Sequence, residues 1–153
     1  MKRIDIEAAP MHVGSGYPPP HDAPCAARVR RRLGDAGGLT AFGVNQLTLP
    51  PGAWSSQRHW HSTEDEFVMV LSGEVVLATD AGEEVLRAGD CAAFPASEPD
   101  GHHLINRGSA DAVVLEVGTR RSDDRTVYSD IDMIAEPGED GFRHRDGAPY
   151  LTT

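Results

Sequence analysis

Short apolar runs separated by frequent turn residues dominate this chain. It has 16 glycines and 11 prolines among 153 residues, and helical periodicity is scarce. Alternating or β-branched runs occur instead at residues 39–49, 67–71, 74–79, 84–87, 91–94 and 112–117. Residues 80–83 and 88–90 contain Asp and Gly, which tolerate the dihedral angles of tight turns. Many short strands joined by close turns predict an antiparallel, all-β sandwich or barrel.

The composition is that of an ordinary globular domain. Hydrophobic residues make up 39% and charged residues 25%, and 153 residues suffice for one hydrophobic core. The formal net charge of −10 opposes binding to nucleic acid or to an anionic membrane. The chain has no apolar run long enough to cross a bilayer, no secretory signal pattern and no CxxC motif. We therefore expect a reduced, cytoplasmic protein without a nucleic-acid or membrane partner.

The two ends of the chain differ from its middle. Residues 17–20 read Tyr-Pro-Pro-Pro, which favours extended polyproline geometry, and residues 28–32 hold four arginines, which we interpret as part of a solvated arm. Beyond residue 118, charges alternate with glycines, and residues 128–134 are the most apolar stretch. We expect an N-terminal arm (1–38) packed on the barrel or on a partner subunit, a barrel (39–118) and a C-terminal extension (119–153).

Two histidines and a glutamate have the spacing of a metal site. His59 and His61 are two residues apart, so an extended strand would point both imidazoles to the same face. Glu66 follows at the start of the next apolar run, and a third imidazole is available downstream from His102 or His103. Neutral imidazoles with one carboxylate suit a divalent transition metal, and this donor set accepts iron, manganese, nickel, cobalt or zinc.

The residues around these donors resemble the two sequence motifs of the cupin superfamily, in particular its small single-domain members. The first motif has a glycine, a His-x-His pair, a glutamate and a second glycine, positions occupied here by Gly52, His59, His61, Glu66 and Gly73. The second motif corresponds to Gly89, Pro95, His102 and Asn106. The loop before the first histidine is one residue longer than the usual pattern, and the loop after the proline is also longer. The resemblance implies a double-stranded β-helix, or jelly-roll, barrel.

The resemblance also implies a metal bound by His59, His61, Glu66 and His102. The longer second loop leaves the third histidine open between His102 and His103, and the spacing to Asn106 favours His102 because the motif places the ligand four positions earlier. His103 would then point away from the metal and is a candidate for the substrate pocket. Cys91 is a second pocket candidate, although a small buried hydrophobic residue is its simpler interpretation.

The function implied by the resemblance is that of a small metalloenzyme acting on a small, polar, oxygen-rich substrate. Isomerase or lyase chemistry and dioxygenase chemistry both occur in such proteins, and so do non-catalytic modules that bind or sense a small molecule. A fold alone does not choose among these functions, so whether the chain is an enzyme stays open at this point. Proteins of this kind often pair through their sheets and terminal arms, and we expect a homodimer.

Overall fold

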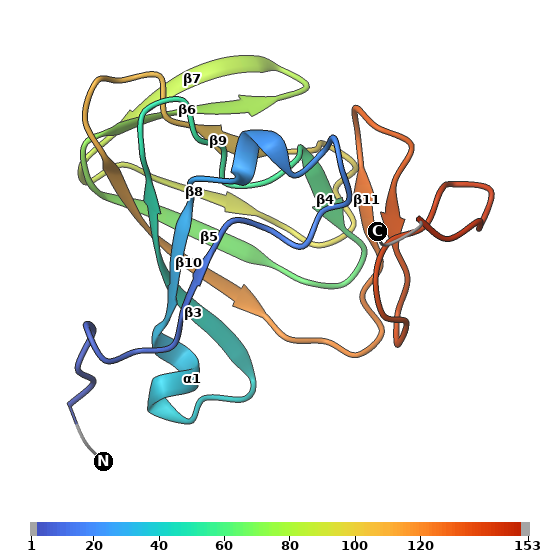
Figure 1. Cartoon of the computed structure of the whole chain (residues 1–153), viewed down its shortest axis with the longest axis horizontal. Coiled ribbons are helices and arrows are strands. Elements are labelled where there is room, and N and C mark those ends of the chain that lie inside the picture. Colours follow the sequence, from blue (N-terminus) through green and yellow to red (C-terminus); the bar gives the residue numbers. More distant parts are fainter. Residues whose placement is uncertain (1–2, 151–153) are drawn as a thin grey trace.

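The computed structural model describes residues 3–150, and nearly all of its regular structure is β (Figure 1). The helical segments in that range are a 3-10 turn, η1 (Ala23–Cys25), and one short helix, α1 (Leu33–Gly37). The predicted all-β class is therefore confirmed. Within the described range, no helix combines the length and the apolar composition that crossing a membrane requires.

The strands form one large and two small antiparallel sheets. The large sheet has the order β1 (Met11–Val13), β2 (Val29–Arg32), β3 (Phe42–Leu49), β10 (Ala112–Thr119), β5 (Glu66–Ser72), β8 (Cys91–Phe94). A second sheet has the order β7 (Gly82–Arg87), β6 (Glu74–Thr79), β9 (His103–Ile105). The third has the order β12 (Ile134–Ala135), β11 (Thr126–Tyr128), β4 (His59–His61).

The hydrophobic core lies between the large sheet and the sheet of β7, β6 and β9. Strand alternation produces it: in β5, Val68 and Val70 are buried, whereas Phe67 and Leu71 on the other face are exposed. The buried cluster consists of Leu47, Leu49, Ala53, Val68, Val70, Val75, Leu77, Leu86, Leu104, Ala112 and Val114. This core includes side chains of β5, which begins with Glu66, and of β9, which directly follows His102.

Gly73, the last residue of the first motif, makes the turn from β5 into β6. Its φ of 76° lies in the left-handed region, which favours glycine. A Cβ at this position would lie 2.9 Å from the carbonyl oxygen of Asp111 and 2.9 Å from the Cα of Ala112. The motif therefore requires glycine here for both backbone conformation and packing.

Two segments near the N-terminus, residues 11–13 and 29–32, are strands of the large sheet. Strand β2 pairs with β3, and β1 pairs with β2, so these two strands extend the sheet beyond β3. The solvated-arm interpretation of the basic run is wrong for Arg28, whose exposed fraction is only 7%. The side chains of Arg28, Arg30 and Arg32 line the interior cavity. They lie on one face of the strand because successive side chains alternate, and Val29 and Arg31 lie on the other face.

The C-terminal extension supports the strand that contains the His-x-His pair. Strand β11 pairs with β4, placing Thr126 opposite His61 and Tyr128 opposite His59. Figure 1 shows this extension, in orange and red, beside β4. Tyr128 is buried, as is Met133 in the turn that follows. The orientation of the two histidines thus depends on residues outside the central barrel.

Candidate metal centre

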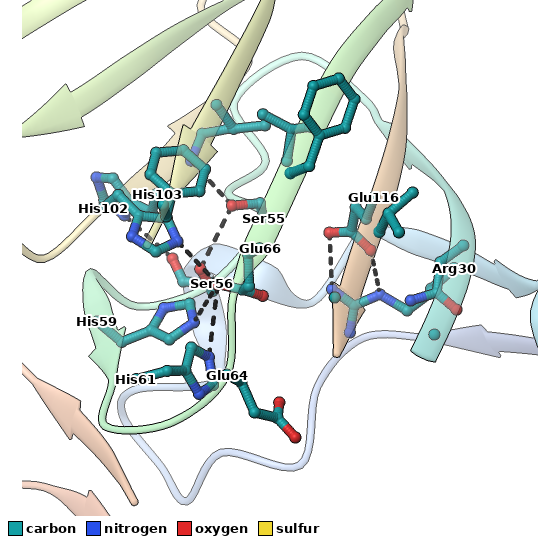
Figure 2. Close-up of a pocket in the computed structure, with 18 of the residues that line it drawn as sticks. Arg30, Ser55, Ser56, His59, His61, Glu64, Glu66, His102, His103 and Glu116 are labelled. Atoms are coloured by element: carbon teal, nitrogen blue, oxygen red, sulfur yellow. Dashed lines mark hydrogen bonds and ion pairs between the residues drawn. The ribbon is translucent and has the colours of Figure 1, made fainter. Parts of the chain in front are cut away.

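Three separate segments bring the predicted metal ligands to one cavity of about 400 Å³ (Figure 2). Strand β4 presents His59 and His61 to the same side, as strand alternation predicts, and β5 begins with Glu66. His102 precedes β9 and pairs with His59 in an isolated β-bridge, in which each backbone N–H donates to the carbonyl of the other residue. These four side chains all line the cavity.

The Nε2 atoms of three histidines face a single carboxylate oxygen. Oε2 of Glu66 lies 2.9 Å from Nε2 of His102, 3.5 Å from that of His61 and 3.7 Å from that of His59. The donor atoms of His59, His61 and Glu66 all lie within 4.8 Å of one another, which is close enough for one ion to bind all three. His102 adjoins this group through its contact with Glu66.

The outer ring nitrogens of the His-x-His pair are held by acceptors. Nδ1 of His59 lies 2.9 Å from the carbonyl oxygen of Gln57, and Nδ1 of His61 lies 2.6 Å from Oδ2 of Asp124. Because both partners only accept hydrogen bonds, both Nδ1 atoms carry the proton, which leaves the Nε2 lone pairs facing the cluster. This arrangement orients imidazoles as metal ligands.

His102 is oriented differently. Its ring stacks on Phe94 with centroids 3.5 Å apart and an interplanar angle of 2°. Its Nδ1 atom is buried and has no hydrogen-bond partner within residues 3–150. Stacking therefore fixes the plane of this ring, whereas hydrogen bonds fix the rings of His59 and His61.

The protonation states of His59 and Glu66 also suit a cation. Burial lowers the pKa of His59 to about 4, so its imidazole is neutral at pH 7. Burial alone would raise the pKa of Glu66, but the hydrogen bond with His102 and the neighbouring imidazoles outweigh it and lower the pKa to about 2. Neutral imidazoles and an ionised carboxylate are the forms that bind divalent transition metals. The residues present therefore fit such an ion.

The far wall of the cavity is rich in charged groups that the sequence analysis missed. Figure 2 shows Arg30 and Glu116 across the cavity from the histidines, and their side chains form two hydrogen bonds of 2.8 and 3.0 Å. Arg28 lines the same space. Arg28, Arg30 and Arg32 are two residues apart in the sequence. This spacing could have indicated that the three side chains share one face of a strand.

Two acidic residues near the His-x-His pair were also missed. Asp124 holds Nδ1 of His61, and Glu64 lines the cavity. Together, His61, Glu64 and Asp124 form a second group whose donor atoms lie within 4.8 Å of one another. Burial raises the pKa of the Glu64 carboxyl. Glu64 lies in the turn between β4 and β5.

The two predicted pocket candidates lie in different environments. His103 is buried beside the cavity, its Nδ1 lies 3.1 Å from the carbonyl oxygen of Ser56, and its ring packs edge-on against Trp54. Cys91 is exposed on β8, and the residues that line the cavity do not include it. The structure thus places His103, but not Cys91, where a bound molecule could contact it.

Asp124→Asn should weaken metal binding by roughly 10–100-fold, because the carboxylate that orients His61 would become an amide. Metal titration of the stripped protein with a competing chelator measures this change. Asp123→Asn is the matched control, since Asp123 is exposed and pairs with Arg121. Equal affinity in the Asp124 variant and the wild type would show that this hydrogen bond does not support the site.

The fold and the group of histidines with one glutamate define a class of β-sheet proteins with a candidate metal site in a cavity. The sequence pattern of the cupin domain family matches residues 45–118. A sugar phosphate isomerase of the cupin superfamily from Silicibacter pomeroyi is 45% identical, with 98% of this chain and 97% of that chain covered and a TM-score of 0.92. The chain therefore belongs to the cupin superfamily, and the predicted cupin fold is confirmed.

Two further solved structures are similar. A candidate sugar phosphate isomerase from Acidithiobacillus ferrooxidans is 30% identical, covers 84% of this chain and 83% of its own, and has a TM-score of 0.73. A polyketide cyclase from Streptomyces resistomycificus shares the fold alone, with 20% identity, coverage of 86% and 89%, and a TM-score of 0.65. No curated protein matches the chain at a significant level.

Proposed function

We propose that this cupin is a metal-dependent isomerase of a small phosphorylated sugar. The observation that carries the proposal is the convergence of three imidazole nitrogens and Glu66 inside a polar cavity of about 400 Å³, a size suited to a small molecule. The proposal is further supported by two similar proteins, 45% and 30% identical, that are named for sugar phosphate isomerisation. It selects one of the reaction types that the sequence left open.

The residues proposed to hold the ion are His59, His61, Glu66 and His102. When bound, a divalent ion would supply Lewis-acid polarisation of the sugar's carbonyl oxygen. The donor set accepts iron, manganese, nickel, cobalt or zinc. His103 and the far wall of the cavity would then contact the rest of the sugar.

Glu64 is the residue that we expect to transfer a proton. Its carboxylate lines the cavity, and Oε1 accepts a hydrogen bond of 2.6 Å from the backbone N–H of Arg121. Within residues 3–150, no Arg or Lys side chain forms an ion pair with it. A carboxylate without an ion-pair partner can remove the proton from the carbon beside the carbonyl and return it to the former carbonyl carbon.

The reaction balances without a further reactant. Converting an aldose to a ketose moves one hydrogen from the carbon beside the carbonyl to the former carbonyl carbon. The hydroxyl group on the carbon beside the carbonyl loses its proton and becomes the new carbonyl, and the former carbonyl oxygen gains a proton and becomes a hydroxyl. No oxidant or reductant is consumed, so the protein needs only the ion, a proton-transferring group and a pocket that positions the sugar.

The test is conversion of aldose and ketose phosphates by metal-loaded protein in D₂O, followed by NMR. We expect interconversion with deuterium incorporated at the transferred position and no conversion after metal removal. If no sugar phosphate is converted but one raises the melting temperature, the alternative of a non-catalytic binding module is favoured. Oxygen consumption by the iron(II) form would instead favour a dioxygenase.

The homodimer stays a prediction, and the outer face of the large sheet is where we expect the contact. Met11, Val13, Phe67 and Leu71 lie on this face with exposed fractions of 56%, 55%, 36% and 44%. Such apolar exposure is typical of association surfaces. Light scattering at micromolar concentration should give twice the chain mass, and Leu71→Glu should shift the protein toward the monomer. A monomeric wild type would contradict the prediction.

A further inference from the structure

Arg28 is a buried cation that lines the cavity. Only 7% of its surface is exposed, and its Nε donates a hydrogen bond of 2.9 Å to the carbonyl oxygen of Gly14. Its Nη1 donates to the carbonyl oxygen of Ser55. Both acceptors are neutral, and within residues 3–150 no carboxylate forms an ion pair with Arg28 and no acceptor is hydrogen-bonded to Nη2. A buried charge without a counter-charge is costly and therefore unusual in a folded protein.

The other arginines around the cavity differ from Arg28 in this respect. Arg30 forms two hydrogen bonds with Glu116. Arg32 and Arg120 both pair with Asp35, which also lines the cavity. Each of these three guanidinium groups contacts a carboxylate, with Asp35 shared by two of them, whereas Arg28 contacts none. Among the arginines that line the cavity, Arg28 is therefore the one without a direct ion-pair partner within residues 3–150.

Aromatic rings connect Arg28 to the candidate metal site. Its guanidinium lies 6.0 Å from the ring centroid of Tyr17, and Tyr17 packs edge-on against Tyr128 with centroids 5.5 Å apart. The ring of Tyr128 lies 5.7 Å from that of His59. The guanidinium and the histidines line the same cavity, and the two tyrosine rings form a continuous run of contacts between Arg28 and His59. A molecule with an anion at one end and a carbonyl group at the other could reach both.

We infer that Arg28 binds the phosphate group of the substrate and so determines which end of the sugar faces the metal ligands. The guanidinium is a planar group of donors that matches phosphate geometry, and its unpaired nitrogen would supply the contact. A buried cation also selects against uncharged sugars, since they leave its charge unbalanced. The inference deepens the proposed function, on which it rests for the identity of the substrate.

Inorganic phosphate is the probe for this site, titrated by calorimetry into both metal-loaded and metal-free protein. The metal-free protein excludes binding through the ion. Arg28→Met should weaken phosphate binding by about tenfold or more, and Arg28→Lys by about threefold, because the ammonium cannot keep both backbone contacts and also reach the anion. Arg107→Met is the matched control, since Arg107 is exposed and pairs with Glu83, and it should leave the affinity unchanged.

A second measurement needs no mutation that could prevent folding. The Nε–H group of Arg28 is buried and hydrogen-bonded, so its NMR signal should be visible at neutral pH and should shift saturably as phosphate is added. An unmoved signal, or equal phosphate affinity in the wild type and Arg28→Met, would overturn the inference. Acetate binding as tightly as phosphate would overturn the assignment to phosphate.

The outcomes separate this inference from the proposed function. Loss of phosphate binding in Arg28→Met, in a protein that converts no sugar phosphate, would support the anion site and contradict the isomerase. Conversion by Arg28→Met with an unchanged KM would support the isomerase and contradict the anion site. A KM for a sugar phosphate that rises about tenfold in this variant, with kcat and metal content little changed, would support both.

Discussion

Replacing Glu64 with Gln should reduce turnover by about 10²–10⁴-fold while leaving the metal content unchanged. The amide keeps the size of the carboxylate and can still accept the hydrogen bond from the backbone of Arg121, which measures 2.6 Å in the native protein. It cannot accept a proton from carbon at neutral pH. The measurement is kcat on a converted sugar phosphate, together with the metal content of the same sample.

Glu83→Gln is the matched control for this prediction. Glu83 is exposed on β7 and pairs with Arg107, so its replacement should change kcat by less than about twofold. Native turnover in Glu64→Gln would exclude Glu64 as the proton-transferring residue. Loss of metal from Glu64→Gln would instead indicate that Glu64 binds the ion, as its position in the group with His61 and Asp124 would allow.

Asn106→Ala should lower the free energy of unfolding by about 3 kcal/mol or more. The side chain is fully buried, and its Nδ2 donates hydrogen bonds of 2.6 Å to the carbonyl of Leu49 and 2.8 Å to that of Ala110. Its Oδ1 accepts a bond of 2.8 Å from the N–H of Gly108. Alanine would leave these backbone groups without their partner, at a cost of about 1–3 kcal/mol each. Urea denaturation measures the change.

Ser109→Ala tests whether this loop is simply sensitive to substitution. Ser109 is exposed in the same loop, and its replacement should change stability by less than about 0.5 kcal/mol. A loss of less than about 1 kcal/mol in Asn106→Ala would show that the hydrogen bonds of the amide are replaced by others. A large loss of stability in Asn106→Ala would show that the asparagine of the second motif holds this loop in place. It would then need no direct role at the metal site.

The cupin fold and the grouping of His59, His61 and Glu66 could be predicted because the signals are local. Residues 74–79 and 91–94 were predicted as strands and form β6 and β8 with the same bounds. His59 and His61 share a face through simple alternation, and Glu66 follows after one turn. The structure places His102 beside Glu66 and His103 against Ser56, and the assignment of His102 as the third histidine ligand stays a prediction.

The remaining features depend on contacts between distant residues. Nothing near Arg28 in the sequence indicates that the following strand pairs with β3, so a basic run was interpreted as solvated. Asp124 contacts His61 across 63 positions, through the pairing of β11 with β4. The sequence also gave no reason to distinguish Glu64 from the other acidic residues of its turn. Such roles follow from strand register, which a single sequence specifies only weakly.

The most direct test of the metal site is elemental analysis after stripping the protein and reloading it with manganese, iron, nickel, cobalt or zinc. We predict about one ion per chain in the wild type and in His103→Ala, and almost none in the double variant His59→Ala/His61→Ala, although that variant should remain folded and rich in β-structure. Retention of a full equivalent by the double variant, or a wild type that binds none of these ions, would contradict the account.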